Sequence, residues 1–387
     1  TNYELFEREP SQLQEFFANP ELQGINITFP YKVNALEACD VVDPRAERIG
    51  CVNTMVRKDG KWHGYNTDYD GFVFTLKHAG IDVSGKECII LGDGASSATV
   101  HVALEDLGAK SITHLSRKTA PLYTDAPNYY ETAQIIINCT PIGMYPHNPA
   151  SLIDIMQFSK LEGVVDLIYN PRRTVLLLQA EMMGIPHCDG LPFLVAQGVE
   201  AANHFQGESF GTKEIEQILR DMRREKENII LIGMPGVGKT TVGKAIGKKM
   251  GRTCIDVDQE LAKEIGDISK YITEQGEVAF REKEAEMIAK LGMQTGIVIS
   301  TGGGCVTVPK NFAHLRQNGR IYQLTQPVEK LSTSGRVLSG GGIERLRELE
   351  ETRTPMYESF AQCIVEHNRN APETVAAILE DFEANLL

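Results

Sequence analysis

A glycine-rich loop that contains a lysine is the strongest chemical signal in the sequence. Residues 233–240 have the sequence GMPGVGKT, which satisfies the pattern G-x-x-x-x-G-K-[ST]. The loop follows the apolar run IILIG and precedes a predicted helix over 240–250. Backbone N–H groups of such a loop bind phosphate oxygens, the lysine reaches the outer phosphates, and the following hydroxyl suits Mg²⁺. The predicted phosphate-binding residues are Gly233, Gly236, Gly238, Lys239, Thr240 and Thr241, with Thr240 also a metal ligand. An accidental glycine turn is the alternative.

A second glycine pattern indicates a dinucleotide cofactor. Residues 91–104 have the sequence LGDGASSATVHVAL, in which a G-x-G pair follows an apolar strand and opens a predicted helix. The third glycine of the usual pattern is absent, so an ordinary tight turn is the alternative. The next predicted strand ends in a basic turn rather than in the acidic residue that binds the ribose of NAD, which favours the 2′-phosphate of NADP over an exposed turn without a ligand. The candidate cofactor residues are Gly92, Gly94, Ser116, Arg117 and Lys118.

The elements that must position these loops alternate between strands and helices. Apolar runs at 87–92, 111–116, 134–139 and 163–168 predict strands of a Rossmann-like sheet, and 51–66 predicts a hairpin that turns at Asp59-Gly60. The predicted fold class is α/β, with a substrate domain and a Rossmann-like NADP domain followed by a P-loop kinase domain with a parallel sheet. The predicted divisions are 1–84 plus 190–210 for the substrate domain, 85–189 for the NADP domain, 211–228 for a helical linker and 229–387 for the kinase.

Length, charge and cysteine usage narrow the function classes. The chain has 387 residues, enough for two or three domains, and a net charge of −13, which argues against a nucleic-acid partner. Eight scattered cysteines form no C-x-x-C pair, so reduced thiols are expected. No apolar run approaches membrane-spanning length and no signal peptide is apparent. These features predict a cytoplasmic enzyme without a membrane partner, and they leave the oligomeric state open.

Residues 226–387 resemble shikimate kinase in several motifs that occur in that family's order. The resembling segments are the phosphate loop, CIDVDQEL (254–261), GEVAFREKE (276–284), STGGGCV (300–306), SGRVLSGGGIERL (334–346) and RTPMY (353–357). The resemblance implies that Asp256 orders Mg²⁺, that Asp258 contacts the attacking hydroxyl as a candidate base, and that Arg336 closes over the phosphates. It also implies that Arg281 and Arg353 grip the shikimate carboxylate beside Gly303 and Gly304. Taken singly, each arginine could be a solvated surface charge.

Residues 1–207 resemble shikimate dehydrogenase. The resembling segments are GINITFPYK (24–32), IGCVNT (49–54), YNTDYDG (65–71), INCTPIGM (137–144), VVDLIYNP (164–171) and DGLPFLVAQG (189–198). The resemblance implies that Lys32 and Asp68 form the catalytic pair beside the substrate carbonyl. Asn26, Thr28, Asn53 and Gln197 would hold the substrate hydroxyls. Tyr169 and Gly190 would lie near the nicotinamide and the substrate, with Tyr169 a substrate-binding residue, and Met144 would bind the cofactor. The alternatives are that Lys32 is a solvated lysine at a helix start and that Asp68 only caps the helix at 69–79.

The chain departs from the dehydrogenase family at two points. Pro192 and Phe193 stand where the family often has Gly-Met or Ser-Met. The family also begins with a strand and a Ser-x-Ser element that grips the substrate carboxylate, and the printed sequence starts at Thr1 without it. TNYELF (1–6) is expected to be a strand that enters an ongoing fold. We therefore expect an incomplete dehydrogenase site in this chain, with weak substrate binding and an intact kinase.

The resulting hypothesis is a bifunctional enzyme of aromatic biosynthesis. Its first half would reduce 3-dehydroshikimate with NADPH, and its second half would phosphorylate shikimate with MgATP. One alternative is a dehydrogenase that acts on quinate, which an assay with quinate and NAD would separate. The other alternative is a non-catalytic fusion that senses these ligands, and retention of the transferring groups Lys32, Asp68, Lys239, Asp258 and Arg336 argues against it.

Overall fold

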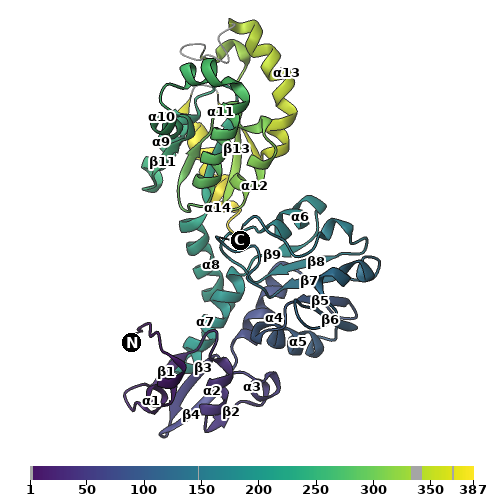
Figure 1. Ribbon diagram of the computed structural model, residues 1–387. Helices are drawn as coiled ribbons and strands as arrows, with labels where there is room; N and C mark the ends of the chain where they lie inside the picture. The colour runs from purple at the N-terminus through teal and green to yellow at the C-terminus, as the bar shows by residue number, and fades with distance from the viewer. Residues whose placement is uncertain (1–2, 147, 333–341, 368–369) are drawn as a thin grey trace. The chain divides into compact units, whose positions relative to one another are not determined.

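The computed structural model describes residues 3–146, 148–332, 342–367 and 370–387. The chain forms two compact units, drawn in Figure 1. Unit 1 comprises residues 1–170 and 174–218, and unit 2 comprises residues 171–173 and 219–387. The division between the units falls within helix α8 (Thr212–Lys226).

The first sheet of unit 1 has four short strands in the order β1-β3-β4-β2. The strands are β1 (Gly24–Asn26), β2 (Val41–Val42), β3 (Thr54–Lys58) and β4 (Lys61–Tyr65), with helices α1 (Leu13–Ala18), α2 (Lys32–Ala38) and α3 (Pro44–Ile49) and the 3₁₀ turn η1 (Pro10–Gln12). The predicted hairpin is confirmed: β3 and β4 pair antiparallel, and the turn residues Asp59 and Gly60 have φ values of 49° and 77°. Positive φ at both positions matches the twist of paired strands.

The segment before η1 is not the strand that its sequence suggested. Residues 3–9 have no strand pairing, and Tyr3 and Leu5 are 68% and 93% exposed. A strand is defined by backbone bonds to a neighbour. This segment instead makes side-chain contacts, in which the Tyr3 hydroxyl donates to Asn26 Oδ1 at 3.0 Å and the Phe6 ring meets Phe16.

The second sheet of unit 1 is parallel throughout, in the order β6-β5-β7-β8-β9. Successive residues of β5 contribute to two different apolar clusters, because alternate side chains point to opposite faces. Burial on both faces explains the continuous apolar runs that predicted these strands. The elements are β5 (Glu87–Leu91), β6 (Ser111–Leu115), β7 (Ile135–Asn138), β8 (Gly163–Asp166), β9 (His187–Cys188), α4 (Asp68–Ala79), α5 (Ala95–Asp106), α6 (Val175–Met183), α7 (Leu191–Gln206), η2 (Tyr123–Tyr129) and η3 (Ile155–Gln157).

Unit 2 is built on a five-stranded parallel sheet in the order β11-β12-β10-β13-β14. Its central strand β10 (Asn228–Gly233) is buried along its whole length and leads directly into the phosphate loop. The other elements are β11 (Cys254–Asp256), β12 (Val298–Ser300), β13 (Gly319–Thr325), β14 (Cys363–Glu366), α9 (Lys239–Met250), α10 (Val257–Ile265), α11 (Ile268–Gly292), α12 (Lys310–Arg316), α13 (Gly342–Phe360), α14 (Ala371–Ala384), η4 (Cys305–Thr307) and η5 (Val328–Lys330).

Two further expectations from the sequence can be compared with the structure. All eight cysteines are free thiols, as predicted. Among the helices of the described ranges, none combines the length and the apolar character needed to cross a membrane.

Candidate active sites

Unit 1 pairs the two candidate catalytic residues of the dehydrogenase. Lys32 is the first residue of α2 and Asp68 is the first residue of α4. The Lys32 Nζ and Asp68 Oδ2 atoms are 2.5 Å apart, and the two side chains are only 14% and 5% exposed. Lys32 is therefore not a solvated lysine. The N-cap of α4 is Thr67 rather than Asp68, so Asp68 is not present merely as a cap. The pair has the chemistry of a proton donor held in place by a carboxylate.

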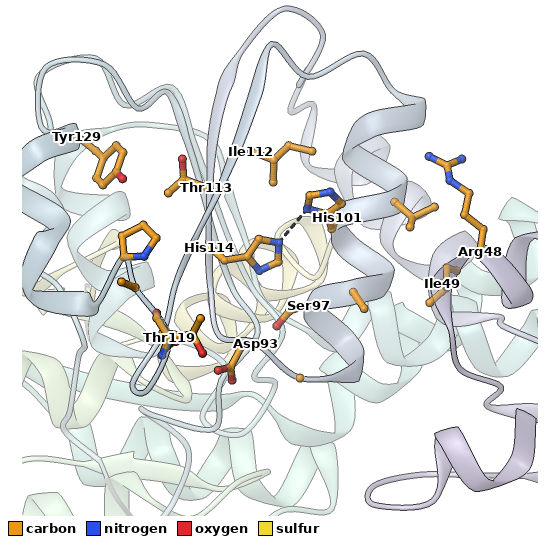
Figure 2. Close-up of a pocket in the computed structure, with 16 residues that line it drawn as sticks. Arg48, Ile49, Asp93, Ser97, His101, Ile112, Thr113, His114, Thr119 and Tyr129 are labelled. Carbon is orange, nitrogen blue, oxygen red and sulfur yellow. Dashed lines mark hydrogen bonds between the residues drawn. The ribbon is translucent and has the colours of Figure 1, made fainter.

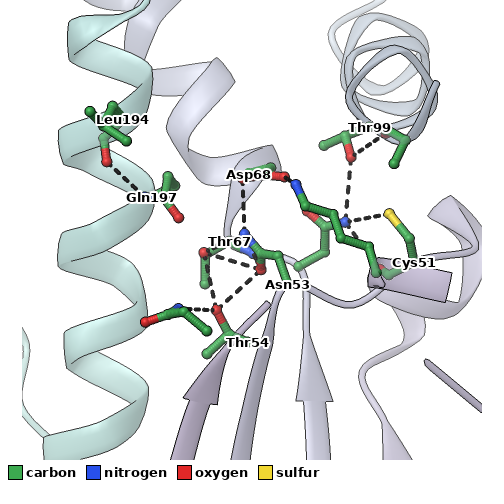
Figure 3. Close-up of polar contacts among 12 residues, drawn as sticks. Cys51, Asn53, Thr54, Thr67, Asp68, Thr99, Leu194 and Gln197 are labelled. Carbon is green, nitrogen blue, oxygen red and sulfur yellow. Dashed lines mark hydrogen bonds and ion pairs between the residues drawn. The ribbon is translucent and has the colours of Figure 1, made fainter. Parts of the chain in front are cut away.

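An amide side chain orients the carboxylate from its other side (Figure 3). Asn53 Nδ2 donates to Asp68 Oδ1 at 2.9 Å, and Asn53 Oδ1 accepts from the Thr67 backbone N–H at 2.8 Å. The network continues through Thr54 Oγ1, which donates to Asn53 Oδ1 at 3.1 Å and accepts from Asn26 Nδ2 at 3.1 Å. Three predicted site residues, Asn26, Asn53 and Asp68, thus belong to one connected network.

The remaining predicted residues of this site are not joined to that network by direct bonds. Thr28 is exposed, Tyr169 and Met144 are 51% and 42% exposed, and the Gln197 amide donates to the Leu194 carbonyl of its own helix at 2.8 Å. Gly190 has a packing reason of its own, because a Cβ there would lie 2.0 Å from the Leu167 carbonyl oxygen. Their roles at the substrate stay predictions.

A cavity of about 700 Å³ lies beside the G-x-G turn (Figure 2). It is lined by Gly94, which caps α5, and by Ser116, which follows β6. Gly92 has a φ of 115°, a left-handed conformation that favours glycine, and a Cβ there would lie 3.1 Å from Thr140 Cγ2. The start of a twelve-residue helix facing such a cavity suits the phosphates of a dinucleotide.

The basic turn after β6 is held by its own serine. Ser116 Oγ accepts from the Thr119 backbone N–H at 2.9 Å and donates to the Thr119 carbonyl at 2.8 Å, so this hydroxyl shapes the turn. Arg117 and Lys118 are both exposed at the end of the strand. Ser116 and Thr119 line the cavity but Arg117 and Lys118 do not, so the contact of these two cations with a cofactor stays a prediction.

Sequence reasoning did not identify a buried carboxylate at the ends of β7 and β8. Asp166 accepts from Thr174 Oγ1 at 2.6 Å, from Asn138 Nδ2 at 3.0 Å and from the Ile168 N–H at 3.1 Å. These donors favour the charged form, but complete burial outweighs them and raises the pKa of Asp166 to about 7. An aspartate that ends an apolar strand was the available signal. Of its three partners, Ile168 and Thr174 follow it closely in the chain and only Asn138 comes from another strand.

The raised pKa of Asp166 predicts a pH-dependent stability. The folded protein binds this proton more tightly than the unfolded chain, where the ordinary pKa is 3.8. The free energy of unfolding of unit 1 should therefore fall as the pH rises from about 4 to about 7. Asp166→Asn should remove this contribution, on the order of 4 kcal/mol. Urea titrations followed by the fluorescence of Trp62, the single tryptophan, measure it. Asp82→Asn, at an exposed site, is the control. If the stability of Asp166→Asn depended on pH as that of the unmutated chain does, this prediction would be contradicted.

Unit 2 gathers the candidate kinase residues around one cavity of about 560 Å³. Lys239 Nζ donates to the Gly233 carbonyl at 2.8 Å and to the Met234 carbonyl at 3.1 Å. Positive φ values of 87° at Gly236 and 99° at Gly238 turn the loop around the start of α9. The predicted residues that line the cavity are Gly236, Gly238, Lys239, Thr240, Thr241, Asp256, Asp258, Arg281, Gly303, Gly304 and Arg353. The predicted Arg336 lies outside the described residues.

Two oxygen donors of this cavity suit a magnesium ion. Thr240 Oγ1 donates to Asp256 Oδ2 at 2.6 Å, so the hydroxyl and the carboxylate share one small volume next to the phosphate loop. In the described part of the chain, no cluster of three or more His, Cys, Asp or Glu side chains could hold a metal. Mg²⁺ typically uses one or two protein oxygens together with waters and substrate phosphates, and the Thr240–Asp256 pair fits that pattern.

Arg281 is positioned by a buried glutamate that the same motif supplies. Arg281 Nη1 lies 2.7 Å from Glu284 Oε2, and Arg281 Nη2 lies 3.0 Å from Glu277 Oε1. Glu284 is fully buried, and burial raises the pKa of its carboxyl although Arg281 opposes the shift. A Cβ at Gly304 would lie 2.1 Å from Arg281 Nη2, so a larger residue there would displace the guanidinium from its present position.

The glycine triplet also accommodates side chains that are already present in the protein. A Cβ at Gly302 would lie 2.4 Å from Glu284 Oε1, and one at Gly303 would lie 2.7 Å from Pro235 Cγ. The Gly303 carbonyl accepts from Arg353 Nη1 at 3.1 Å and from the Tyr357 hydroxyl. Tyr357 was not identified from the sequence, because its role depends on a partner fifty-four residues away. These contacts anchor Arg353 beside the cavity.

Comparisons with known proteins match the first and last parts of the chain to two different families. Residues 1–55 match the family model of the shikimate dehydrogenase substrate binding domain, and residues 235–383 match that of shikimate kinase. A shikimate dehydrogenase (NADP(+)) of Clostridium perfringens is 34% identical over 214 residues, which cover 52% of this chain and 79% of the relative.

Two solved structures are similar to the first part of the chain. A chorismate mutase/shikimate 5-dehydrogenase fusion protein from Clostridium acetobutylicum is 31% identical with a TM-score of 0.54, over 57% of this chain and 85% of that one. Shikimate dehydrogenase 1 from Peptoclostridium difficile is 32% identical with a TM-score of 0.51, over 56% and 85%.

Proposed function

Because the chain belongs to the shikimate dehydrogenase family and carries a shikimate kinase domain at residues 235–383, we propose that it catalyses two consecutive reactions. Unit 1 reduces 3-dehydroshikimate to shikimate with NADPH, and unit 2 transfers a phosphoryl group from MgATP to the 3-hydroxyl of shikimate. One observation supports the proposal above the others: each unit holds a connected set of groups with the chemistry that its reaction requires.

In the proposed reduction, Lys32 supplies the proton. When it is bound, NADPH would supply the hydride for the carbonyl carbon of the substrate. Lys32 Nζ donates a proton to the carbonyl oxygen, which becomes the new hydroxyl group. Asp68 holds the ammonium group through the 2.5 Å contact, and Asn53 holds Asp68 through the 2.9 Å hydrogen bond. This arrangement limits the motion of the proton donor.

In the proposed phosphorylation, the residues around the cavity of unit 2 orient shikimate and neutralise the charge of the phosphates. Arg281 and Arg353 bind the shikimate carboxylate in fork geometry, which directs one hydroxyl toward ATP. Asp258 accepts the hydroxyl proton, and Lys239 exchanges its carbonyl partners for phosphate oxygens. Thr240 and Asp256 hold Mg²⁺, which supplies charge neutralisation when it is bound. Arg336 is proposed to add a further positive charge at the phosphates.

The full chain tests the proposal in one assay. With NADPH, and with 3-dehydroshikimate at concentrations high enough to offset the weak substrate binding expected from the sequence, we expect oxidation of NADPH and formation of shikimate. Addition of ATP and Mg²⁺ should convert the product to shikimate 3-phosphate, detected by mass spectrometry. Omission of ATP should stop the sequence at shikimate, and a parallel reaction with quinate and NAD tests the related activity. Absence of NADPH oxidation would contradict the activity proposed for unit 1. Absence of shikimate phosphorylation would contradict the activity proposed for unit 2.

The cofactor preference gives a separate prediction. Arg117→Glu should weaken NADP binding by roughly tenfold or more, because one charge-assisted contact to the 2′-phosphate is lost and a repulsive charge is introduced. NAD binding should change far less, since NAD lacks that phosphate. Titration calorimetry of both cofactors on the full chain measures the ratio, with Lys110→Glu, on β6's preceding loop, as the control for charge. Equal losses for NADP and NAD would contradict the role of Arg117.

A further inference from the structure

Two histidines form part of the wall of the dinucleotide cavity (Figure 2). His101 lies on α5 and His114 lies on β6, and both line the cavity together with Gly94 and Ser97. His101 Nδ1 and His114 Nε2 are 2.9 Å apart, and the two rings are stacked with centroids 5.1 Å apart. We call His101 and His114 the histidine pair. The proposed reduction does not use the histidine pair.

The partners of the histidine pair determine where its protons lie. His114 Nδ1 is 3.2 Å from the Gly92 carbonyl oxygen, which can only accept, so His114 Nδ1 donates to the G-x-G turn. In neutral His114 the Nε2 atom then accepts, and His101 Nδ1 donates to it. On the far side of His101, Nε2 lies 3.4 Å from Glu105 Oε1, a carboxylate oxygen that also only accepts.

This geometry accommodates one positive charge. A proton on His101 Nε2 meets Glu105 and leaves the other hydrogen bonds of the histidine pair unchanged. A further proton on His114 Nε2 would instead face the proton on His101 Nδ1, and the 2.9 Å hydrogen bond would break. The histidine pair is therefore a coupled site that exists either neutral or with a single charge on His101.

Charged groups of several elements face the histidine pair. Glu105 comes from α5, and Arg48 from α3 binds Glu105 and Asp106 at 2.8 and 2.6 Å. Asp93 of the G-x-G turn and Tyr129 of η2 line the same cavity. Burial is the main cause that lowers the pKa of His114. Since Asp93 brings a carboxylate to a phosphate-binding cavity, a charge on His101 would offset it.

We propose that the histidine pair is a titratable part of the cofactor-binding wall, which takes up a proton when the phosphate-bearing end of NADP binds. The inference rests on the proposed use of NADP by unit 1. It makes His114 a positioning residue, because it holds the Gly92 carbonyl, and His101 the carrier of the charge. The ligand class is a dinucleotide phosphate, and the property assigned is proton-linked binding.

The sign of the linkage follows from charge. An anionic cofactor favours the protonated histidine pair, so the pKa of the pair is higher in the complex than in the free protein. NADP affinity is then highest at low pH, and this gain in affinity is lost as the pH rises through the pKa of the complex. A difference of one pKa unit corresponds to about a tenfold ratio between the limiting affinities.

Titration calorimetry on the full chain tests this inference. NADP⁺ is titrated between pH 6.5 and 8.5 in buffers of different ionisation enthalpy, which gives the number of protons taken up on binding. His101→Asn is the main variant, because the asparagine amide replaces the Nδ1 donor to His114 but cannot carry the charge. His187→Asn is the matched control: His187 lies on β9 at the opposite edge of the sheet, and its Nδ1 donates to the Ile185 carbonyl at 2.9 Å.

We expect the unmutated chain and His187→Asn to take up a fraction of a proton. His101→Asn should take up less and bind NADP⁺ about threefold to tenfold more weakly at pH 6.5, with little difference at pH 8.5. His114→Asn keeps the donor to Gly92 and leaves the charge on His101, so it should retain the proton uptake, whereas His114→Leu should weaken binding at every pH. Equal proton uptake in the unmutated chain and His101→Asn would overturn the inference alone. No NADP⁺ binding by the unmutated chain would overturn the proposed cofactor as well.

Discussion

Lys239→Ala should abolish shikimate phosphorylation while reduction of 3-dehydroshikimate continues at the unmutated rate. Lys239 is buried at the start of α9, and its ammonium group is held by two backbone carbonyls at the point where the phosphate loop turns. Its loss removes a positive charge from the site of phosphoryl transfer, where such charges contribute most. We expect kcat for phosphorylation to fall by at least about 10³-fold, as for other preorganised charges at phosphoryl groups. Steady-state kinetics with shikimate and ATP measure the loss.

The control for this variant lies on the same helix. Lys248→Ala removes an exposed lysine near the C-terminal end of α9 and should leave both activities within about twofold of the unmutated chain. Since the carbonyls of Gly233 and Met234 lose a donor in Lys239→Ala, the thermal stability of unit 2 should be measured for both variants. Turnover like that of the unmutated chain in a folded Lys239→Ala protein would refute the phosphate-loop assignment.

Lys32→Met should have the opposite effect to Lys239→Ala: it should impair the reduction of 3-dehydroshikimate and leave phosphorylation unchanged. The methionine keeps much of the aliphatic stem but cannot donate a proton to the reducible carbonyl. Loss of a positioned proton donor costs about 10²- to 10⁴-fold in rate, so kcat for reduction should fall within that range. Phosphorylation of shikimate by the same preparation should be unaffected, which makes the kinase an internal control for folding and concentration. Lys77→Met, at an exposed position on α4, controls for the substitution itself.

The contact between Lys32 and Asp68 also predicts how the activity losses of single and double variants of this pair should combine. Asp68→Asn keeps the acceptor for Asn53 Nδ2 but removes the charge that holds the Lys32 ammonium group. Because the two residues act as one unit, the double variant should lose much less activity than the product of the single losses. Multiplicative losses in reduction would show that Lys32 and Asp68 act independently, and the proposed proton donation would then lack its positioning partner.

The local features of the fold were predictable because they depend on neighbouring residues. The hairpin at Asp59-Gly60, the strand before each glycine-rich turn and the helix after it follow from periodicity and from the need for positive φ. The TNYELF segment marks the limit of this reasoning. Its alternating residues suit a strand, but a strand also needs a partner for its backbone, and residues 3–9 bind the domain through side chains instead.

The sequence by itself determined the fold class, the two glycine-rich turns and the types of residue available for chemistry, since short-range spacing constrains the backbone directly. Only the tertiary structure decided which of these residues meet. The contact of Lys32 with Asp68 spans thirty-six positions, the carboxylate of Asp166 accepts from Asn138 twenty-eight positions away, and His114 reaches both His101 and Gly92. Burial and pairing of this kind arise from the packing of strands and helices that are distant in the chain, and no local pattern records them.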